Sequence, residues 1–145
     1  MKGYRAAAEG CACFSLRKAA RAVTQLYDAR LRPNGLKATQ FSLLVGLAVG
    51  GPITMQRLAE RMVMDRTTLT RNVKPLQRAG LVKSTTGKDR RTRTLSLTGK
   101  GRKALARALP LWQQAQDTVL GRLGETQWQA LRAALGKAAV QSAPD

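Results

Sequence analysis

A chain of 145 residues with 43% hydrophobic residues is long enough for one globular domain with its own core and too hydrophobic for a disordered chain. It carries 26 lysines and arginines against 8 acidic residues, a formal net charge of +18 that indicates an anionic partner such as nucleic acid. The sequence has no histidine, which excludes catalytic triads with a histidine base and zinc sites with histidine ligands.

No stretch of the chain predicts a membrane span or a signal peptide. The longest apolar run, LLVGLAVGG, is much shorter than the roughly 18–20 apolar residues that a span needs. The opening residues, MKGYRAAAEGC, lack the apolar segment of a signal peptide. We therefore expect a cytoplasmic protein with no membrane partner, in which Cys11 and Cys13 are reduced.

The first half of the chain is predicted to be helical, because its apolar residues recur with helical spacing. The predicted helices cover residues 13–31, 37–49, 53–62 and 66–80. Thr39, Thr54 and Asp65 are the expected N-caps of the last three, since a side-chain oxygen at that position accepts a free backbone N–H. Pro75 removes a backbone hydrogen bond inside the fourth helix and should bend it.

The second half of the chain adds a β-hairpin and two more helices. LVKSTT and TRTLSLT are predicted strands that flank a highly charged tip. Thr98 is the expected N-cap of a long helix that runs to about Leu120, with a kink at Pro110. TQWQALRAALGKAAV predicts a final helix. The sequence therefore predicts a mainly α fold with one small hairpin.

The third and fourth predicted helices, joined by a tight turn and followed by a basic hairpin, have the order of a winged helix-turn-helix. In that motif the N-terminal residues of the second helix face base edges in the major groove of DNA. The polar side chains at this position are Arg66, Thr67, Thr68, Thr70 and Arg71, with Lys74 one turn further on. Arginine bonds guanine through two donors, and threonine offers a hydroxyl to bases or a methyl to thymine.

The charged hairpin tip is the second candidate contact with nucleic acid. Its basic residues are Lys88, Arg90, Arg91 and Arg93, in a segment between Arg57 and Arg107 that holds 15 basic and 3 acidic residues. A hairpin beside a major-groove helix lies over the adjacent minor groove, whose negative potential attracts arginine. Asp89 is expected to pair with an arginine and hold the turn. Alone, such a run is often a solvated loop, but beside this helix pair it predicts DNA binding.

The segment MQRLAERMVMDRTTLTRNVKPLQRAGLVKSTTGKDRRTRTLSLTGKG resembles the DNA-binding core of the MarR family of bacterial transcription regulators. The resemblance implies one MarR-like domain over residues 1–145, with a winged-helix lobe at 37–100 and dimerisation helices at 11–32 and 98–140. It implies that Arg91 enters the minor groove, that Asp89 is its structural partner, and that Thr67, Thr68, Thr70 and Arg71 lie on the reading face. It further implies a homodimer on a pseudo-palindromic operator, usually acting as a repressor.

The apolar residues of the terminal helices independently favour a dimer. Leu109, Trp112, Leu123, Trp128, Leu131 and Leu135 present more apolar surface than a small winged lobe buries by itself. The alternative is that these residues complete the core of a monomer.

The two cysteines are candidate effector residues. CACFSLRKAARAVTQLY resembles the start of organic-hydroperoxide repressors in the same family, with Cys13, Phe14 and Tyr27 matching a reactive cysteine, a phenylalanine and a tyrosine. A helix start and Arg17 one turn away favour the thiolate of Cys13, whose oxidation would release DNA.

Two other interpretations of the cysteines remain open. Cys11 and Cys13 of two subunits can together bind a thiophilic metal, because thiolates select soft ions. Otherwise Cys13 is a small buried hydrophobe and Cys11 is incidental. In that case the effector is a small aromatic or anionic ligand bound between the dimer helices and the lobe.

Other functional classes fit the sequence less well. An enzyme is disfavoured because the chain has no histidine, no carboxylates close together in sequence and no glycine-rich phosphate loop, and no cofactor is expected. A non-specific architectural or RNA-binding protein would place aromatic residues in the basic segment, but all six aromatics lie outside it. The sequence therefore predicts a sequence-specific double-stranded DNA-binding regulator, expected to be a repressor released by an effector.

Overall fold

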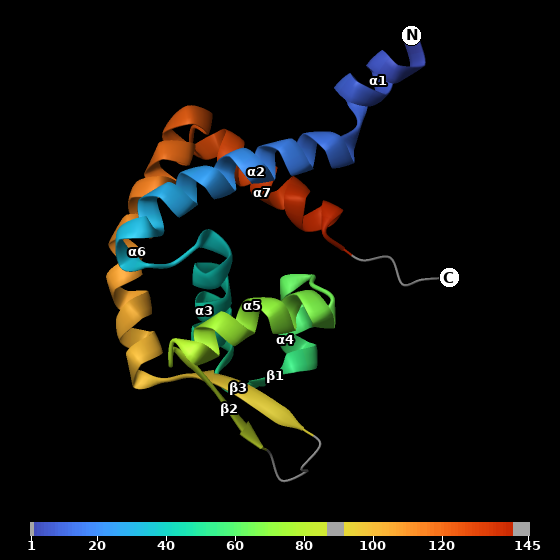
Figure 1. Ribbon diagram of the computed structural model, residues 1–145. Helices are drawn as coiled ribbons and strands as arrows, with labels where there is room; N and C mark the ends of the chain where they lie inside the picture. The colour runs from blue at the N-terminus through green and yellow to red at the C-terminus, as the bar shows by residue number, and fades with distance from the viewer. Residues whose placement is uncertain (1, 87–91, 141–145) are drawn as a thin grey trace.

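The computed structural model of the chain describes residues 2–86 and 92–140, which form a mainly helical fold with a small sheet (Figure 1). The helices are α1 Lys2–Gly10, α2 Ala12–Leu31, α3 Ala38–Gly50, α4 Met55–Met62, α5 Arg66–Arg78, α6 Gly99–Leu123 and α7 Glu125–Ala138, with a short 3-10 turn at Arg32–Asn34. The strands are β1 Ile53–Thr54, β2 Val82–Thr86 and β3 Arg93–Leu97. This confirms the predicted fold class.

The structure has two parts, which α6 joins. The lobe consists of α3, α4, α5, the three strands and the first half of α6, and it occupies the lower part of Figure 1. The arms consist of α1, α2, α7 and the second half of α6, in the upper part of the same view. Within the described ranges, no helix is both long and apolar enough to cross a membrane.

The sheet is antiparallel, in the order β1-β3-β2. Val82 is paired with Leu97 and Thr85 with Thr94, so β2 and β3 form the wing, and the hydroxyls of Thr85 and Thr94 are 2.9 Å apart across it. β1 was not expected, because residues 53–62 were predicted as one helix. It forms because Thr54 is the N-cap of α4, which leaves Ile53 and Thr54 extended and able to pair with β3.

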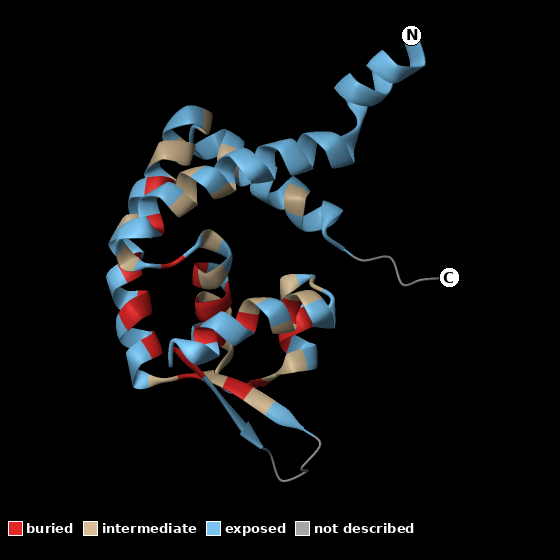
Figure 2. Cartoon of the chain, in the orientation of Figure 1, coloured by how far each residue is buried: buried red, intermediate tan, exposed pale blue. Residues whose placement is uncertain are grey.

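The hydrophobic core lies in the lobe (Figure 2). Its most deeply buried side chains come from α3, α4, α5 and β3 and include Leu43, Leu44, Leu58, Leu69, Leu76 and Leu95. The first half of α6 lies close against the lobe: a Cβ added at Gly101 would overlap the carbonyl oxygen of Leu81. Glycine is therefore required where α6 meets the chain that leaves α5.

The helix ends follow mostly local rules. Thr54, Asp65 and Thr98 are N-caps as predicted, accepting hydrogen bonds from backbone N–H groups three residues on. The prediction for Thr39 was wrong, since α3 begins at Ala38. The Ala38 N–H instead donates to the Asp28 carboxylate over 2.7 Å, so a side chain from α2 supplies the acceptor.

Two further differences from the predicted elements concern helices. The long helix that was predicted to end at about Leu120 extends to Leu123 as α6, while the helices that contain Pro75 and Pro110 continue past each proline, as expected. Residues 2–10 form a helix, α1, that the sequence analysis did not predict. This helix is exposed along its whole length, so no apolar face of its own indicated it.

Candidate nucleic-acid interface

The outward face of α5 is fixed by what the helix buries and by its N-cap. Leu69, Val73 and Leu76 point into the lobe, which turns the opposite side of the helix to solvent. The Asp65 carboxylate accepts from the Thr68 backbone N–H at 2.8 Å and from the Thr68 hydroxyl at 2.6 Å. Both hydrogen bonds from Thr68 lower the pKa of Asp65, and the bond from the Thr68 hydroxyl has the larger effect. The cap is therefore charged at neutral pH.

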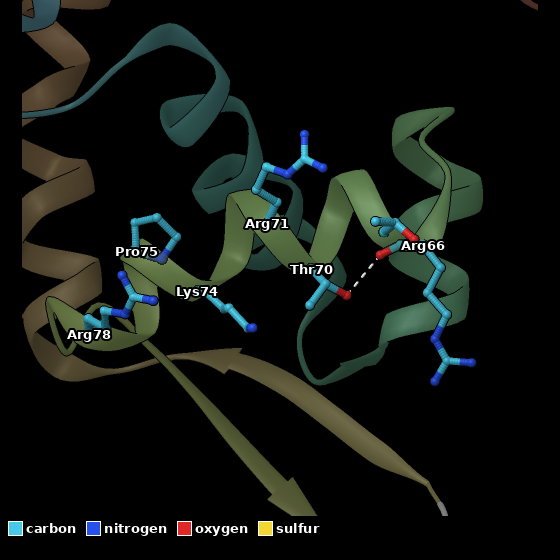
Figure 3. A pocket seen from close by; sticks show the side chains of 7 residues that line it. Arg66, Thr70, Arg71, Lys74, Pro75 and Arg78 are labelled. Carbon is cyan, nitrogen blue, oxygen red and sulfur yellow. Dashed lines mark hydrogen bonds between the residues drawn. The ribbon is translucent and has the colours of Figure 1, made fainter.

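A groove of about 640 Å³ runs along this outward face (Figure 3). It is lined by Arg66, Thr67, Thr70, Arg71, Lys74, Pro75 and Arg78. Four of these seven side chains are cationic, and no carboxylate of the described residues is among them. Such a surface presents donors and positive charge to an anionic ligand that is long enough to follow the helix.

The structure brings together most of the residues predicted on α5. Thr68 is the exception: it is half-buried in the N-cap and does not line the groove. The Thr70 hydroxyl donates to the Arg66 carbonyl oxygen at 2.8 Å, so it offers a partner only lone pairs and its methyl group. Arg78 was missed by the sequence analysis, although it stands four residues after Lys74 and helical spacing alone places it on the same face.

A second cleft, of about 420 Å³, opens between the start of α4, the start of α5 and the start of β3, at the end of the wing nearest its tip. Its lining residues are Thr54, Met55, Gln56, Arg66, Thr92 and Arg93. Arg93 is exposed at the first position of β3. The other predicted wing residues, Lys88, Asp89, Arg90 and Arg91, lie outside the described residues.

An apolar pocket of about 340 Å³ lies where the arms meet the lobe. It is lined by Tyr27, Ala38, Phe41, Ser42, Val45, Leu109 and Trp112. The rings of Phe41 and Trp112 stack in its wall with centroids 6.1 Å apart. The Tyr27 hydroxyl donates to Oε1 of Gln116 at 2.5 Å, and burial raises the pKa of Tyr27, so the phenol is neutral. A neutral, aromatic lining favours an apolar ligand.

Both cysteines are exposed at the start of α2. In the single chain, Cys13 is therefore not a buried hydrophobe. Cys11 is the N-cap of α2, and its sulfur accepts from the Phe14 backbone N–H at 3.5 Å. Tyr27 follows Cys13 by fourteen residues on the same helix, about 21 Å along its axis, so within one chain it lies at the apolar pocket rather than beside the thiol. Among the residues that the structure describes, no three Cys, Asp or Glu side chains form a metal-binding group.

Comparisons with known proteins agree with this geometry. Residues 34–92 match the model of the MarR family. The transcriptional regulator MosR of M. tuberculosis, solved in complex with DNA, is 45% identical to this chain, with a TM-score of 0.79 over 89% of this chain and 96% of MosR. The transcriptional repressor CouR, solved bound to a 23-mer DNA duplex, is 27% identical, with a TM-score of 0.83 over 92% of this chain and 95% of CouR.

A curated relative extends the comparison to sequence. The uncharacterized HTH-type transcriptional regulator YwoH of Bacillus subtilis is 30% identical over 88 residues, which are 61% of this chain and 64% of YwoH. The chain thus spans less than two thirds of the length of that relative.

Proposed function

The chain belongs to the MarR family of winged helix-turn-helix transcription regulators, and from this premise we propose that it is a sequence-specific repressor whose homodimer binds a pseudo-palindromic operator and is released by an effector. The family and the relatives are DNA-binding regulators and not enzymes. A DNA partner supports a cytoplasmic site of action.

The cationic groove along α5 is the observation that carries the proposal. A major groove of DNA about 12 Å wide admits one α-helix, and the exposed side of α5 is the only face of that helix left free by its burial in the lobe. Arg71 and Lys74 stand in the middle of this face, from which we expect them to contact base edges. Arg66 and Arg78 stand at its two ends.

The homodimer is supported by the apolar surface of the arms. Phe14, Leu16 and Val23 on α2, Leu109 on α6 and Leu131 on α7 are all exposed. They do not complete the core of a monomer, because none of them is buried in the single chain. A second copy offers the same apolar faces in return, and the two-fold symmetry of such a dimer matches a pseudo-palindromic operator.

Two effectors are supported by separate observations. The exposed thiols of Cys11 and Cys13 are accessible to an oxidant, which favours release of DNA by cysteine oxidation. A thiophilic metal at the same thiols needs further ligands from a partner subunit. The apolar pocket favours a small aromatic ligand, and because it is lined by no cation of the described residues, a neutral compound fits better than an anion. Either effector acts by changing the separation of the two recognition helices.

The test is a fluorescence-anisotropy titration of the reduced protein on duplex DNA from upstream of its own gene, with a shuffled duplex as competitor. We expect tight binding to the first duplex that the competitor does not displace. Equal affinity for both duplexes would contradict sequence-specific regulation at this site. The titration is then repeated after adding an organic hydroperoxide, with Cys13→Ser as the control. If the oxidant abolishes DNA binding by the wild type but not by the variant, the effector acts by oxidising Cys13. If the oxidant changes neither, the effector is to be sought among ligands of the apolar pocket.

A further inference from the structure

Arg66 lines both the groove along α5 and the cleft at the start of β3, so it forms the boundary between them. Figure 3 shows its side chain extending away from that of Arg71, on the side of α5 that faces the wing. Arg71 lines the groove and not the cleft. The two arginines at the start of α5 are therefore differently placed, although the sequence assigned both to base reading.

The geometry of duplex DNA says what must lie between the groove and the wing. A major groove about 12 Å wide and a minor groove about 6 Å wide are separated by one sugar–phosphate strand. If α5 occupies the major groove and the wing lies over the adjacent minor groove, that strand has to pass between the start of α5 and the wing. The cleft lies between these two elements.

The side chains of the cleft suit a phosphate better than a base. Arg66 from α5 and Arg93 from β3 stand on its two sides, and both are exposed, with no ion pair to a carboxylate among the described residues. Gln56 adds a neutral donor whose amide nitrogen is held by Glu60 Oε1 at 3.1 Å. Glu60 itself does not line the cleft, and the second hydrogen of the Gln56 amide is left to donate to an anion.

We propose that this cleft binds one backbone phosphate of the strand that separates the two grooves, with Arg66 and Arg93 as its charged ligands and Gln56 as a neutral one. The inference rests on the proposed DNA binding and assigns Arg66 a positioning role. The phosphate fixes how far α5 and the wing reach along the duplex. Discrimination between bases then falls to Thr67, Thr70, Arg71 and the residues that follow them on α5.

The test compares four variants that each replace one exposed arginine by glutamine, which removes the charge and keeps hydrogen-bond donors. Arg66→Gln and Arg93→Gln alter the cleft, Arg71→Gln alters the groove alone, and Arg132→Gln on α7 is the matched control outside both. The duplex is selected by the wild-type protein from a random pool. Affinity is measured against salt concentration and on a set of duplexes with single base-pair changes. Thermal melting checks that each variant is folded.

For Arg66→Gln and Arg93→Gln we expect a similar loss of affinity on every duplex of the set and a decrease of about 0.9 in the slope of log K against log salt. The order of preference among duplexes should stay that of the wild type. Arg71→Gln should change that order, and Arg132→Gln should change neither quantity. If Arg66→Gln loses affinity at one base pair only, Arg66 reads a base and the phosphate assignment is overturned while the proposed function stands.

A backbone scan makes the test independent of the mutations. Each duplex of the scan carries one uncharged methylphosphonate, at a different backbone linkage. In each half-site we expect one linkage at which the methylphosphonate weakens binding by the wild type but does not further weaken binding by Arg66→Gln. If Arg66→Gln loses affinity at every methylphosphonate that weakens the wild type, the cleft does not hold that phosphate. If the wild type selects no duplex at all, the proposed function and this inference fail together.

Discussion

The lobe and the arms are both helical, but they differ in how much of their apolar surface the single chain buries. α3, α4 and α5 each contribute buried leucines to one core. α1 and α7, which lie wholly within the described residues, contribute none, and α2 contributes only Leu31 (Figure 2). The contrast shows that the fold of the lobe is determined by its own sequence. The arms leave apolar faces that the described part of the chain does not cover, which supports the proposed dimer.

The largest expected effect is the loss of a core side chain from the lobe. Leu44 is fully buried, and Leu44→Ala should lower the free energy of unfolding by about 2–5 kcal/mol, because it removes apolar contacts and leaves a cavity. Leu131→Ala on α7 makes the same substitution on an exposed arm residue. It should instead raise the concentration at which the dimer dissociates. Urea denaturation measures the free energy of unfolding, and sedimentation measures the dissociation of the dimer. If the two variants lost equal stability at high protein concentration, the contrast between lobe and arms would be contradicted.

A second comparison uses one helix that belongs to both parts. Gly101→Ala in the lobe half of α6 would push a Cβ into the Leu81 carbonyl, and overpacking of this kind costs about 1–3 kcal/mol. Gly121→Ala in the arm half meets no atom within 4 Å and should gain up to about 1 kcal/mol from the helix propensity of alanine. Thermal unfolding of both variants checks the signs. A loss at Gly121 would indicate that a partner chain packs closely against that position.

The exposed side of the lobe should respond in DNA binding and not in stability. Arg71→Ala is expected to cost roughly 1–3 kcal/mol in binding, confined to one operator position, if the guanidinium reads a base there. Its thermal unfolding should match that of the wild type, because Arg71 is exposed. Titrations on duplexes with single base-pair changes measure the effect. A uniform loss at every position would make Arg71 a phosphate contact.

Local rules predicted the parts of the site that depend on neighbours in sequence. Thr54, Asp65 and Thr98 were identified as caps because each is followed by a helix whose first N–H groups need an acceptor. The face of α5 was predicted because Leu69 and Val73 define the buried side. Thr68 was assigned to that face on spacing alone, without allowing for its hydroxyl bonding back to the cap.

Features that combine distant segments were not predictable in this way. The cleft joins Gln56, Arg66 and Arg93 from three elements, and only the packing of α4 against α5 and β3 brings them together. The exposure of Cys13 depends on how the arms pack, and a helix without a core of its own gives no pattern from which to read it. The sequence thus predicted α2, α6 and α7 of the arms, but neither α1 nor which of the arm side chains stay uncovered.

The smallest expected effects are opposite pH responses in the two parts. Hydrogen bonds from Thr68 lower the folded-state pKa of Asp65, so its stabilising effect is present above the ordinary value of 3.8 and is lost as pH falls through the folded-state pKa. Burial raises the pKa of Tyr27 above 10.0, so its contribution is present below pH 10.0 and is lost as pH rises through the folded-state pKa. Asp65→Asn should flatten the acid limb of a stability profile and Tyr27→Phe the alkaline limb. Because Tyr27 lines the apolar pocket and donates to Gln116 on the arm half of α6, a flat alkaline limb in the wild type would mean that the pocket admits water at that tyrosine.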